Sequence, residues 1–584
     1  MIWAVGLCSL PPPMTVRGYR LRGHRKPNHG DVLPPCVYKR KRRLELQKKR
    51  EWADLPFLTV KLVVATSVAA SIGACGGGSD EAPPVPSMRA SCSSLPGTSI
   101  ADTTFTAAEA IPAGDYTTPA GKTVAGLPAF CRLAATIKPT AESDIKVELW
   151  MPTDWNGKFL GTGNGGAGGV IQYDAMAIGL RRGFAVANTD MGTSPDGVSA
   201  VVGKMERIVD YGYRSTHLMT TMSKAMLKQF YSTDPTRSYF YGCSTGGAQG
   251  VQEALKFPQD YDGIVVGAMG HNRVPAHVAG LWAYVATQHD MTTYLTAAKR
   301  KLWADKVMDS CDALDGLRDG VIGRPDKCAV DPSVLQCAAG DGPDCLSAGQ
   351  VGALRKIYAG PTHSVTGEHL YPGFLRGTEL SFPAEVPSAT AVSGGGNFPF
   401  QWIWGLNWNW RSFDFGRDVD VMRNTLNFAV DATSGDLTAF NARGGKMMMF
   451  QGLADPIAAP GETLNYLNTV EKTMPGQSDK FVRLFNAPGM GHCGGGVGPN
   501  VFGNFQVGFP EHPNDPTQDL LAAMEQWVEN GRAPTQITAT KYVNSQPTGP
   551  VERTMPLCAW PKVSKYKGTG DVNSAASFDC VAAD

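Results

Sequence analysis

The sequence predicts an α/β fold, with a mostly parallel β-sheet, helices on both faces and one large insertion. Three observations predict it. Short β-prone runs alternate with helical segments up to about residue 270, a Gly-x-Ser-x-Gly motif lies where one run meets a helix, and the strand pattern resumes near residue 446. Alternating strands and helices are typical of a parallel sheet. With 584 residues, 42% hydrophobic and 18% charged, the chain is long enough for two or three domains.

The N-terminal residues indicate an export leader. Residues 1–61 carry fourteen Lys and Arg against four Asp and Glu, and the apolar run Leu62–Ala74 follows them. Such a run is too short to span a membrane and is typical of a secretory signal. We expect residues 1–75 to be a leader, either an ordinary signal peptide or a lipobox in which Cys75 is lipidated. Residues 1–57 fit no signal-peptide n-region, and a start codon assigned too far upstream would explain them.

Charge and cysteines support export and exclude one class of partner. The basic surplus belongs to the leader, so nothing in the rest of the chain favours nucleic-acid binding. Residues 76–90 are expected to form a tether, and membrane contact is expected only through a lipid on Cys75. Ten cysteines lie beyond Cys75, and an even number in an exported chain predicts disulfides. The protein is therefore expected to be periplasmic, an outer-membrane lipoprotein or secreted.

The first half of the sheet is expected from Ala129 onward. A helical period covers residues 215–230 and a second helix is expected over 248–257. The expected strands are Ile145–Met151, a strand from Phe159 that runs into a glycine-rich loop, Phe184–Asn188, the run that ends at Tyr241, and Ile264–Ala268.

Residues 271–431 break this pattern. They hold four cysteines, many turn signals and the aromatic run Phe398–Phe415. Strands resume at Lys446–Phe450 and Lys480–Phe485, before a helix over residues 518–530 and an irregular tail. We therefore expect 271–431 to be an inserted lid domain, with 91–270 and 432–584 forming the α/β core.

Ser244 lies in the motif Gly242-Cys243-Ser244-Thr245-Gly246, between a strand and a helix. This is the context of a nucleophile elbow, in which glycines permit a sharp turn and the helix N-terminus lies beneath the developing oxyanion. The motif also arises by chance in glycine-rich turns, so its weight depends on partners downstream.

Each resumed strand is followed by such a partner. Asp455 follows the first and His492 the second. The order Ser, Asp, His is that of α/β-hydrolases, where histidine takes the serine proton and the carboxylate orients the histidine. The alternatives are an Asp-Pro turn at Asp455 and a surface loop histidine at His492.

Cys243 directly precedes the serine and Cys493 directly follows the histidine. A bridge between them would join nucleophile to base across a loop of roughly 250 residues, for which the chain-entropy model gives about 5 kcal/mol. The alternative is two unrelated buried cysteines.

These motifs resemble the tannase and feruloyl esterase family, which includes the bacterial hydrolase of mono(2-hydroxyethyl) terephthalate. The similarity extends over roughly residues 92–580 and includes Trp155–Phe159, Tyr261–Ile264 and Pro488–Cys493. It implies an α/β-hydrolase core with a lid and a serine esterase acting on small esters of aromatic carboxylic acids. It also implies the triad Ser244, Asp455 and His492. The implied oxyanion donors are the backbone N–H of Thr245 and one from the glycine-rich loop Gly163–Gly166, where Asn164 is the preferred candidate.

The resemblance further implies a structural Ca²⁺ in the lid. The segment Cys311–Val321 holds three carboxylates and turn glycines, a set of hard oxygen donors suited to Ca²⁺, although read alone it fits a solvated acidic turn as well. The implied ligands are the side chains of Asp312, Asp315 and Asp319 and the carbonyls of Leu317 and Val321.

Sequence proximity and the resemblance together give four more disulfides and the substrate pocket. The expected pairs are Cys311–Cys328, Cys337–Cys345, Cys92–Cys131 and Cys558–Cys580. The lid would supply an aromatic acyl pocket, for which the candidates are Trp402, Trp404, Trp408 and Trp410. No pattern selects among feruloyl, galloyl and terephthaloyl groups. The rival hypotheses are a general carboxylesterase or polyester-related hydrolase, and a catalytically inactive surface-anchored binding protein.

Overall fold

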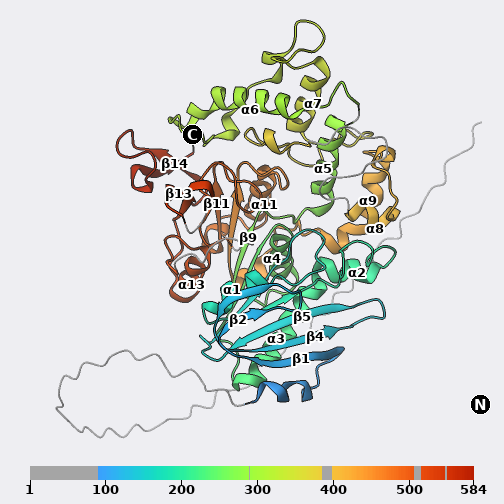
Figure 1. The fold of residues 1–584 in the computed structure, drawn as a ribbon, viewed down its shortest axis with the longest axis vertical. Coiled ribbons are helices and arrows are strands. Elements are labelled where there is room, and N and C mark those ends of the chain that lie inside the picture. Colours follow the sequence, from blue (N-terminus) through green and yellow to red (C-terminus); the bar gives the residue numbers. More distant parts are fainter. Residues whose placement is uncertain (1–89, 289, 384–397, 505–513, 546–548, 584) are drawn as a thin grey trace, which may run out of the picture. The chain divides into compact units, whose positions relative to one another are not determined.

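The computed structural model describes residues 90–583 except 289, 384–397, 505–513 and 546–548 (Figure 1). The expected leader, with Cys75 and its alternative start, and nearly all of the tether lie outside the described residues. No helix within the described part of the chain is both long and apolar enough to cross a membrane.

A nine-stranded sheet organises the core, in the order β1-β4-β5-β7-β6-β8-β9-β10-β11. The pairs β1–β4, β4–β5 and β5–β7 are antiparallel, and the pairs from β7 through β11 are parallel. Its strands are β1 (Thr103–Ile111), β4 (Phe130–Ile137), β5 (Ile145–Pro152), β6 (Lys158–Thr162), β7 (Ala185–Thr189), β8 (Arg237–Cys243), β9 (Gly263–Gly267), β10 (Lys446–Gly452) and β11 (Val482–Ala487).

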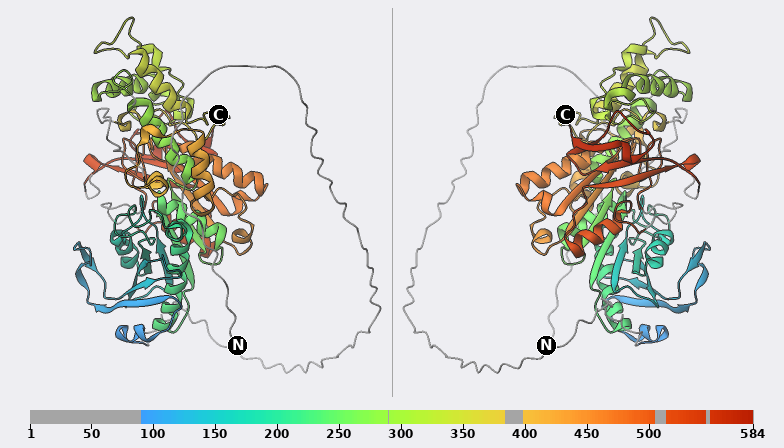
Figure 2. Two further views of the ribbon diagram at one scale, coloured as in Figure 1. Left: turned by 90° about the vertical axis from the view of Figure 1, so that its right-hand side faces the viewer. Right: turned by 90° about the vertical axis from the view of Figure 1, so that its left-hand side faces the viewer.

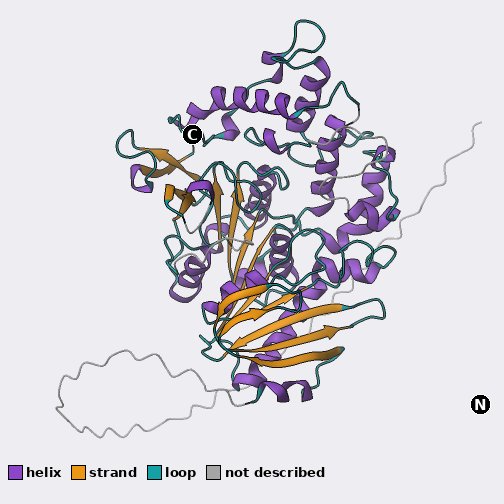
Figure 3. Ribbon diagram, viewed as in Figure 1, coloured by secondary structure: helices purple, strands orange, loops and turns teal. Residues whose placement is uncertain are grey.

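Helices cover both faces of this sheet, which is why a strand such as β9 is apolar and buried along its whole length (Figure 3). On β9, Val265 packs with the helices α1 (Tyr173–Arg181) and α13 (Leu520–Asn530). Its neighbours Ile264 and Val266 face the opposite cluster, which includes α3 (Ser215–Tyr231), α4 (Thr245–Lys256) and α11 (Pro460–Thr473). This arrangement confirms the expected α/β-hydrolase core.

Two expectations about the ends of the core were wrong. Regular structure begins well before Ala129, with β1 and the hairpin of β2 (Gly114–Thr117) and β3 (Thr123–Leu127). No residue of β1 is fully buried, so this edge strand lacks the apolar alternation that would mark it in sequence. The tail is not irregular: it forms two antiparallel pairs, β12 (Gln536–Tyr542) with β13 (Val551–Cys558) and β14 (Lys562–Tyr566) with β15 (Phe578–Ala582).

The C-terminal strands lie beside the β11 edge of the main sheet (red in Figure 2). The amide of Trp560 donates to the carbonyl of Leu484 at 2.8 Å, and Phe485 forms an isolated bridge with Ala559. These contacts cover an edge that would otherwise expose unpaired backbone groups.

The segment between β9 and β10 contributes helices and turns but, among its described residues, no strand of the main sheet. Most of its buried hydrophobic side chains belong to two further clusters, one of which also includes Ile208 and Tyr211 from before β8. Leu437 and Phe440, near its end, pack in the cluster on the sheet. The helices from α5 to α10 are α5 (Arg273–Gln288), α6 (Ala297–Cys311), α7 (Ala348–Ala359), α8 (Phe398–Trp404), α9 (Arg417–Val430) and α10 (Thr438–Ala442). Two short helices, α2 (Met205–Val209) and α12 (Ser478–Phe481), lie in the core segments.

Candidate active site

Ser244 lies in the turn between β8 and α4, with φ 62° and ψ −119°. This is a strained conformation for a residue other than glycine and is typical of a nucleophile elbow. The glycines around it allow close packing: a Cβ on Gly163 would lie 2.5 Å from the Cα of Gly246. The glycine-rich loop after β6 can therefore approach the first turn of α4.

The structure brings Ser244, His492 and Asp455 into hydrogen-bond contact. The Nε2 atom of His492 lies 2.8 Å from Ser244 Oγ, and its Nδ1 atom lies 2.8 Å from Asp455 Oδ2. With Nδ1 carrying the hydrogen that it donates to the carboxylate, Nε2 can accept the serine proton.

Asp455 is fully buried, and its carboxylate is satisfied by the protein. Oδ1 accepts from the amides of Ile457 and Ala458 at 2.8 and 3.0 Å, and Oδ2 accepts from Gln451 Nε2 at 3.2 Å. These bonds hold the carboxyl group in one orientation toward the histidine.

All five expected disulfides are present, among them Cys243–Cys493 with a sequence separation of 250 residues. It joins the residue before the serine to the residue after the histidine. The other four are Cys92–Cys131, Cys311–Cys328, Cys337–Cys345 and Cys558–Cys580.

The expected oxyanion donors require one correction. Thr245 is the first residue of α4, so its amide has no acceptor within the helix. The amide of Asn164, however, donates to Gln249 Oε1 at 2.8 Å, so it is not available to an oxyanion. The next amide, that of Gly165, is exposed and donates to no acceptor in the described residues. Gly165 therefore replaces Asn164 as the candidate.

The four candidate tryptophans do not share one environment. Trp404 and Trp408 stack with Phe400, and Trp410 packs edge-on against Tyr284. Trp402 alone among the four contacts Tyr211, whose hydroxyl donates to the carbonyl of Gly166 in the glycine-rich loop. Only Trp402 is thus joined by contacts to the candidate oxyanion site.

Four residues that the sequence analysis did not single out form hydrogen bonds with residues of the candidate site. Gln249 accepts from the Asn164 amide, and Gln451 donates to Asp455. Tyr211 and Arg273 both contact the Thr245 hydroxyl. None of them lies in a recognisable motif. Gln249 is five residues beyond the serine on a buried helix, and a buried glutamine at such a position is a weak signal that its amide has a specific partner.

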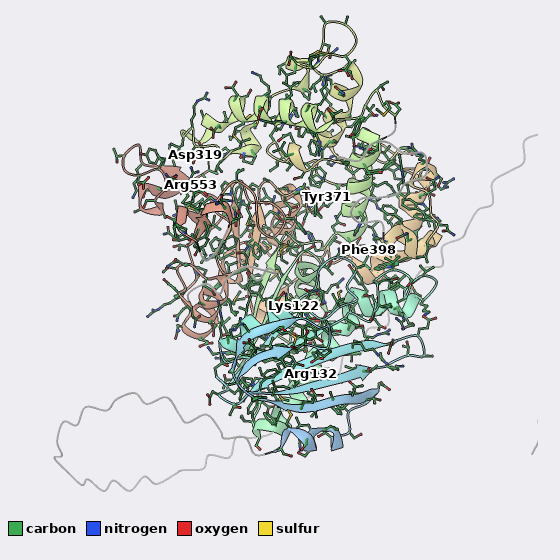
Figure 4. All side chains as sticks on the ribbon, viewed as in Figure 1. Lys122, Arg132, Asp319, Tyr371, Phe398 and Arg553 are labelled. Atoms are coloured by element: carbon green, nitrogen blue, oxygen red, sulfur yellow. A yellow bond between two sulfur atoms is a disulfide. The ribbon has the colours of Figure 1, made fainter. Side chains whose placement is uncertain are left out.

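The acidic loop of the lid supplies donors that suit Ca²⁺. Burial and the charges of Asp319 and Asp312 raise the pKa of Asp315 to about 6, so the loop gathers negative charge that a divalent cation would relieve. Arg553 of β13 also pairs with Asp319, at 2.7 Å between Nη1 and Oδ2, as the adjacent labels in Figure 4 show. The donor chemistry fits a hard cation, with Asp319 shared between such an ion and Arg553.

Among the described residues, one group of side chains places three possible metal-ligating atoms within 4.8 Å of one another: His217, Glu253 and Asp260. The carboxylates of the acidic loop do not converge this closely. Burial and the charge of Asp260 raise the pKa of Glu253 well above its usual value. Lys224 donates to the Asp260 carbonyl, so a cation of the chain already lies beside the two carboxyl groups. A protonated Glu253 removes the charge repulsion between the two carboxyl groups, so the cluster is explained without a metal ion.

A cavity of about 210 Å³ lies between the acidic loop of the lid, the start of α11 and the C-terminal strands. None of the triad residues lines it. A second cavity, of about 10 Å³, is lined in part by Thr245, Tyr211, Gln249 and Arg273.

Comparisons with known proteins show the family of the chain. A family model described as tannase and feruloyl esterase matches residues 131–581. An uncharacterized esterase of Xanthomonas campestris is 35% identical over 529 residues, covering 85% of this chain and 92% of the relative. A probable feruloyl esterase B-2 of Aspergillus terreus is 33% identical over 77% of this chain and 86% of its own length.

Solved structures show the same fold. The crystal structure of feruloyl esterase B from Aspergillus oryzae is 29% identical, with a TM-score of 0.77 over 84% of this chain and 99% of that chain. Tannin acyl hydrolase from Aspergillus niger has a TM-score of 0.67 at 22% identity, over 85% and 96% of the two chains, and supports the fold alone. The chain therefore belongs to the tannase and feruloyl esterase family and is a carboxylic ester hydrolase.

Proposed function

We propose that the chain is an exported serine esterase that cleaves esters of aromatic carboxylic acids through an acyl-enzyme on Ser244. The observation that carries this proposal is the position of His492, which lies 2.8 Å from both Ser244 Oγ and Asp455 Oδ2. Relatives named feruloyl esterase support the class of acyl group.

In the first step Ser244 Oγ attacks the ester carbonyl carbon while its proton passes to His492 Nε2. A C–O bond forms, and the π electrons of the carbonyl move to its oxygen, giving an oxyanion. The amides of Thr245 and Gly165 are the proposed donors to that oxyanion. Asp455, buried and held by two backbone amides, stabilises the imidazolium that His492 becomes.

Collapse of the oxyanion breaks the bond to the alcohol, which leaves with the proton from His492 Nε2. The acyl group stays on Ser244. A water molecule then gives its proton to the same nitrogen and attacks the acyl-enzyme, and a second oxyanion collapses to release the acid and restore the serine.

The lid is the proposed source of acyl selectivity. It reaches the Asp455 side of the site, since Tyr371, labelled in Figure 4, lies in one buried hydrophobic cluster with Ala459, four residues after Asp455. It also reaches the Thr245 side through Arg273. Of the tryptophans, we retain Trp402 as the candidate for contact with an aromatic acyl group and assign Trp404, Trp408 and Trp410 to packing within the lid.

Structural calcium belongs to this proposal, with Asp312, Asp315, Asp319 and the carbonyls of Leu317 and Val321 as its ligands. Removing Ca²⁺ with EDTA should lower the melting temperature, and added Ca²⁺ should restore it, because an ion bound only by the folded state stabilises that state. Asp315→Asn should abolish the response, whereas the exposed Asp309→Asn should not. An unchanged response in Asp315→Asn would exclude the site.

Export is proposed from the leader and is supported by five disulfides. The lipid anchor at Cys75 stays a prediction, tested by the intact mass of the mature protein purified from membranes.

The test of the function is kcat/KM on methyl ferulate, methyl gallate, mono(2-hydroxyethyl) terephthalate and p-nitrophenyl acetate. We expect an aromatic acyl ester to be the best substrate. Ser244→Ala should remove the activity, and the exposed Ser93→Ala should not. The highest value on p-nitrophenyl acetate would favour a general carboxylesterase, and no turnover of any ester would favour a binding protein.

A further inference from the structure

Arg273 is a buried arginine that forms no ion pair with any of the described residues. It begins α5, is 6% exposed, and its Nε atom has no hydrogen-bond partner in the described structure. Other buried arginines are paired with carboxylates, as Arg132 is with Glu148 and Arg182 with Asp519. Since burying an unpaired charge is costly, this arginine needs another explanation.

The nearby carboxylate does not provide one. Asp431 accepts a hydrogen bond from the amide of Val274 at 3.1 Å, so it caps the start of α5. Within the described residues, neither it nor any other carboxylate comes within 4.0 Å of the Arg273 guanidinium nitrogens. The faces of Tyr211 and Phe398 lie near the guanidinium instead, at 5.7 and 6.0 Å from ring centre to Cζ.

The direct partner of Arg273 is Thr245, the residue after the candidate nucleophile. Arg273 Nη2 donates to Thr245 Oγ1 at 3.1 Å, and that hydroxyl in turn donates to the carbonyl of Gly166 at 2.7 Å. A guanidinium can only donate, so the hydroxyl must direct its own hydrogen onward to Gly166. The hydroxyl of Tyr211 donates to the same carbonyl at 2.9 Å.

This chain of bonds joins the two segments that carry the proposed oxyanion donors. Thr245 supplies one amide at the start of α4, and Gly166 directly follows Gly165, which supplies the other. The bond from Thr245 Oγ1 to the Gly166 carbonyl therefore contributes to the distance between the two donors, together with the bond from the Gly246 amide to the Asn164 carbonyl at 2.7 Å. An error of about 1 Å in such a spacing can cost on the order of a hundredfold in rate.

Direct contact between Arg273 and a substrate does not fit the structure. The cavity that it lines with Tyr211, Thr245 and Gln249 holds about 10 Å³, which is enough for one water molecule at most. An acyl group has no room there.

We propose that Arg273 is a positioning residue of the oxyanion hole, acting through Thr245, and that its unpaired charge favours the tetrahedral oxyanion over the neutral ester. This inference rests on the proposed serine esterase function. It also gives the first helix of the lid a role in the chemistry, since a residue of α5 orients a residue of α4.

The test uses Arg273→Gln, Thr245→Val and the double variant in the full-length mature enzyme, with an aromatic ester as substrate. Each single variant should lower kcat on the order of ten- to a hundredfold, with KM within about twofold of wild type. The double variant should be no slower than the slower single variant, because both changes break the same bond. Thr245→Ser, which keeps the hydroxyl, should recover most of the kcat that Thr245→Val loses.

An aryl trifluoromethyl ketone supplies a readout that a general structural defect would not give. It forms a tetrahedral oxyanion adduct with the serine, so its inhibition constant should rise by the same factor as kcat falls. Inhibition by the free aromatic acid should not change. Arg423→Gln is the control, since Arg423 pairs with Glu368 on the lid surface and should leave both values as in wild type.

The outcomes separate this inference from the function on which it rests. If Ser244→Ala is inactive but Arg273→Gln keeps wild-type kcat and ketone inhibition, only the inference is wrong. If losses in the single variants multiply in the double variant, Arg273 does not act through Thr245, and the inference is again wrong. Should Arg273→Gln not fold, Thr245→Val carries the kcat and ketone tests alone.

Discussion

The core and the lid place their side chains by different means. In the core, Ser244, Asp455 and His492 lie in loops directly after β8, β10 and β11, three parallel strands of one sheet. In the lid, Trp402, Trp404, Trp408 and Trp410 are held by aromatic contacts along a segment with no regular sheet around it. Backbone hydrogen bonds define the first set of positions, and side-chain packing defines the second.

This difference separates chemistry from selectivity. A carboxyl edge of parallel strands brings loops from distant parts of the chain together, so a triad there tolerates change in the lid. The predictions below follow from that contrast, in decreasing order of expected effect.

The largest effect is expected in the core. His492→Ala should lower kcat on the order of 10⁴- to 10⁶-fold on every ester, because among the described residues His492 is the group placed to accept the serine proton. Asp455→Asn should cost less, about 10⁴-fold, since serine and histidine stay paired. Steady-state kinetics on an aromatic and an acetyl ester would check both. A loss confined to aromatic esters would contradict the separation of chemistry from selectivity.

The stabilisation that a disulfide provides should differ between the core and the lid. The chain-entropy model gives the Cys243–Cys493 bridge about 5 kcal/mol and the Cys337–Cys345 bridge of the lid about 2.5 kcal/mol, since the loops span 250 and 8 residues. Double Cys→Ala variants of each pair should lower the free energy of unfolding in that order. Urea denaturation measures it, and the reverse order would contradict the prediction.

The same contrast explains what the sequence could predict. The triad and the disulfide beside it follow from motifs, because each residue stands directly after a β-prone run or next to another member. The strand β1 and the C-terminal strands were missed, since their residues are largely exposed or mixed in pattern and are held by pairing with distant segments. Arg273 and Gln249 were missed for a related reason: their contacts exist only once the lid and the glycine-rich loop have met α4.

The junction between core and lid should show a pH-dependent stability. Burial lowers the pKa of His271 to about 4, with the nearby charge of Arg273 adding to the effect. The His271 imidazole binds a proton more weakly in the folded state than in the unfolded state. The stability contributed by neutral His271 is therefore present in full above about pH 6.5 and is lost as pH falls toward 4. The expected loss is roughly 3 kcal/mol in the free energy of unfolding.

Comparison of wild type with His271→Gln isolates that effect. Glu462 faces His271 at 3.7 Å, and its raised pKa works in the opposite direction, adding stability as pH falls, but it is common to both proteins. The difference between their unfolding free energies should therefore shrink between pH 6.5 and 4. A constant difference over this range would show that His271 is not buried as the neutral form.

The smallest effect is expected within the lid. Trp402→Leu should lower kcat/KM on methyl ferulate relative to p-nitrophenyl acetate by about two- to tenfold, the equivalent of one aromatic contact of about 0.5–1.5 kcal/mol. Trp408→Leu, at a position that stacks on Phe400, should leave this ratio unchanged. Equal ratios in both variants would show that Trp402 does not select the acyl group.

The acyl-enzyme itself tests the central claim most directly. Rapid acid quench of the enzyme with methyl ferulate, followed by peptide mass spectrometry, should find a feruloyl adduct on the peptide that contains Ser244. The adduct should be absent in Ser244→Ala. Turnover of the ester with no adduct on Ser244, or with the adduct on another residue, would contradict the account.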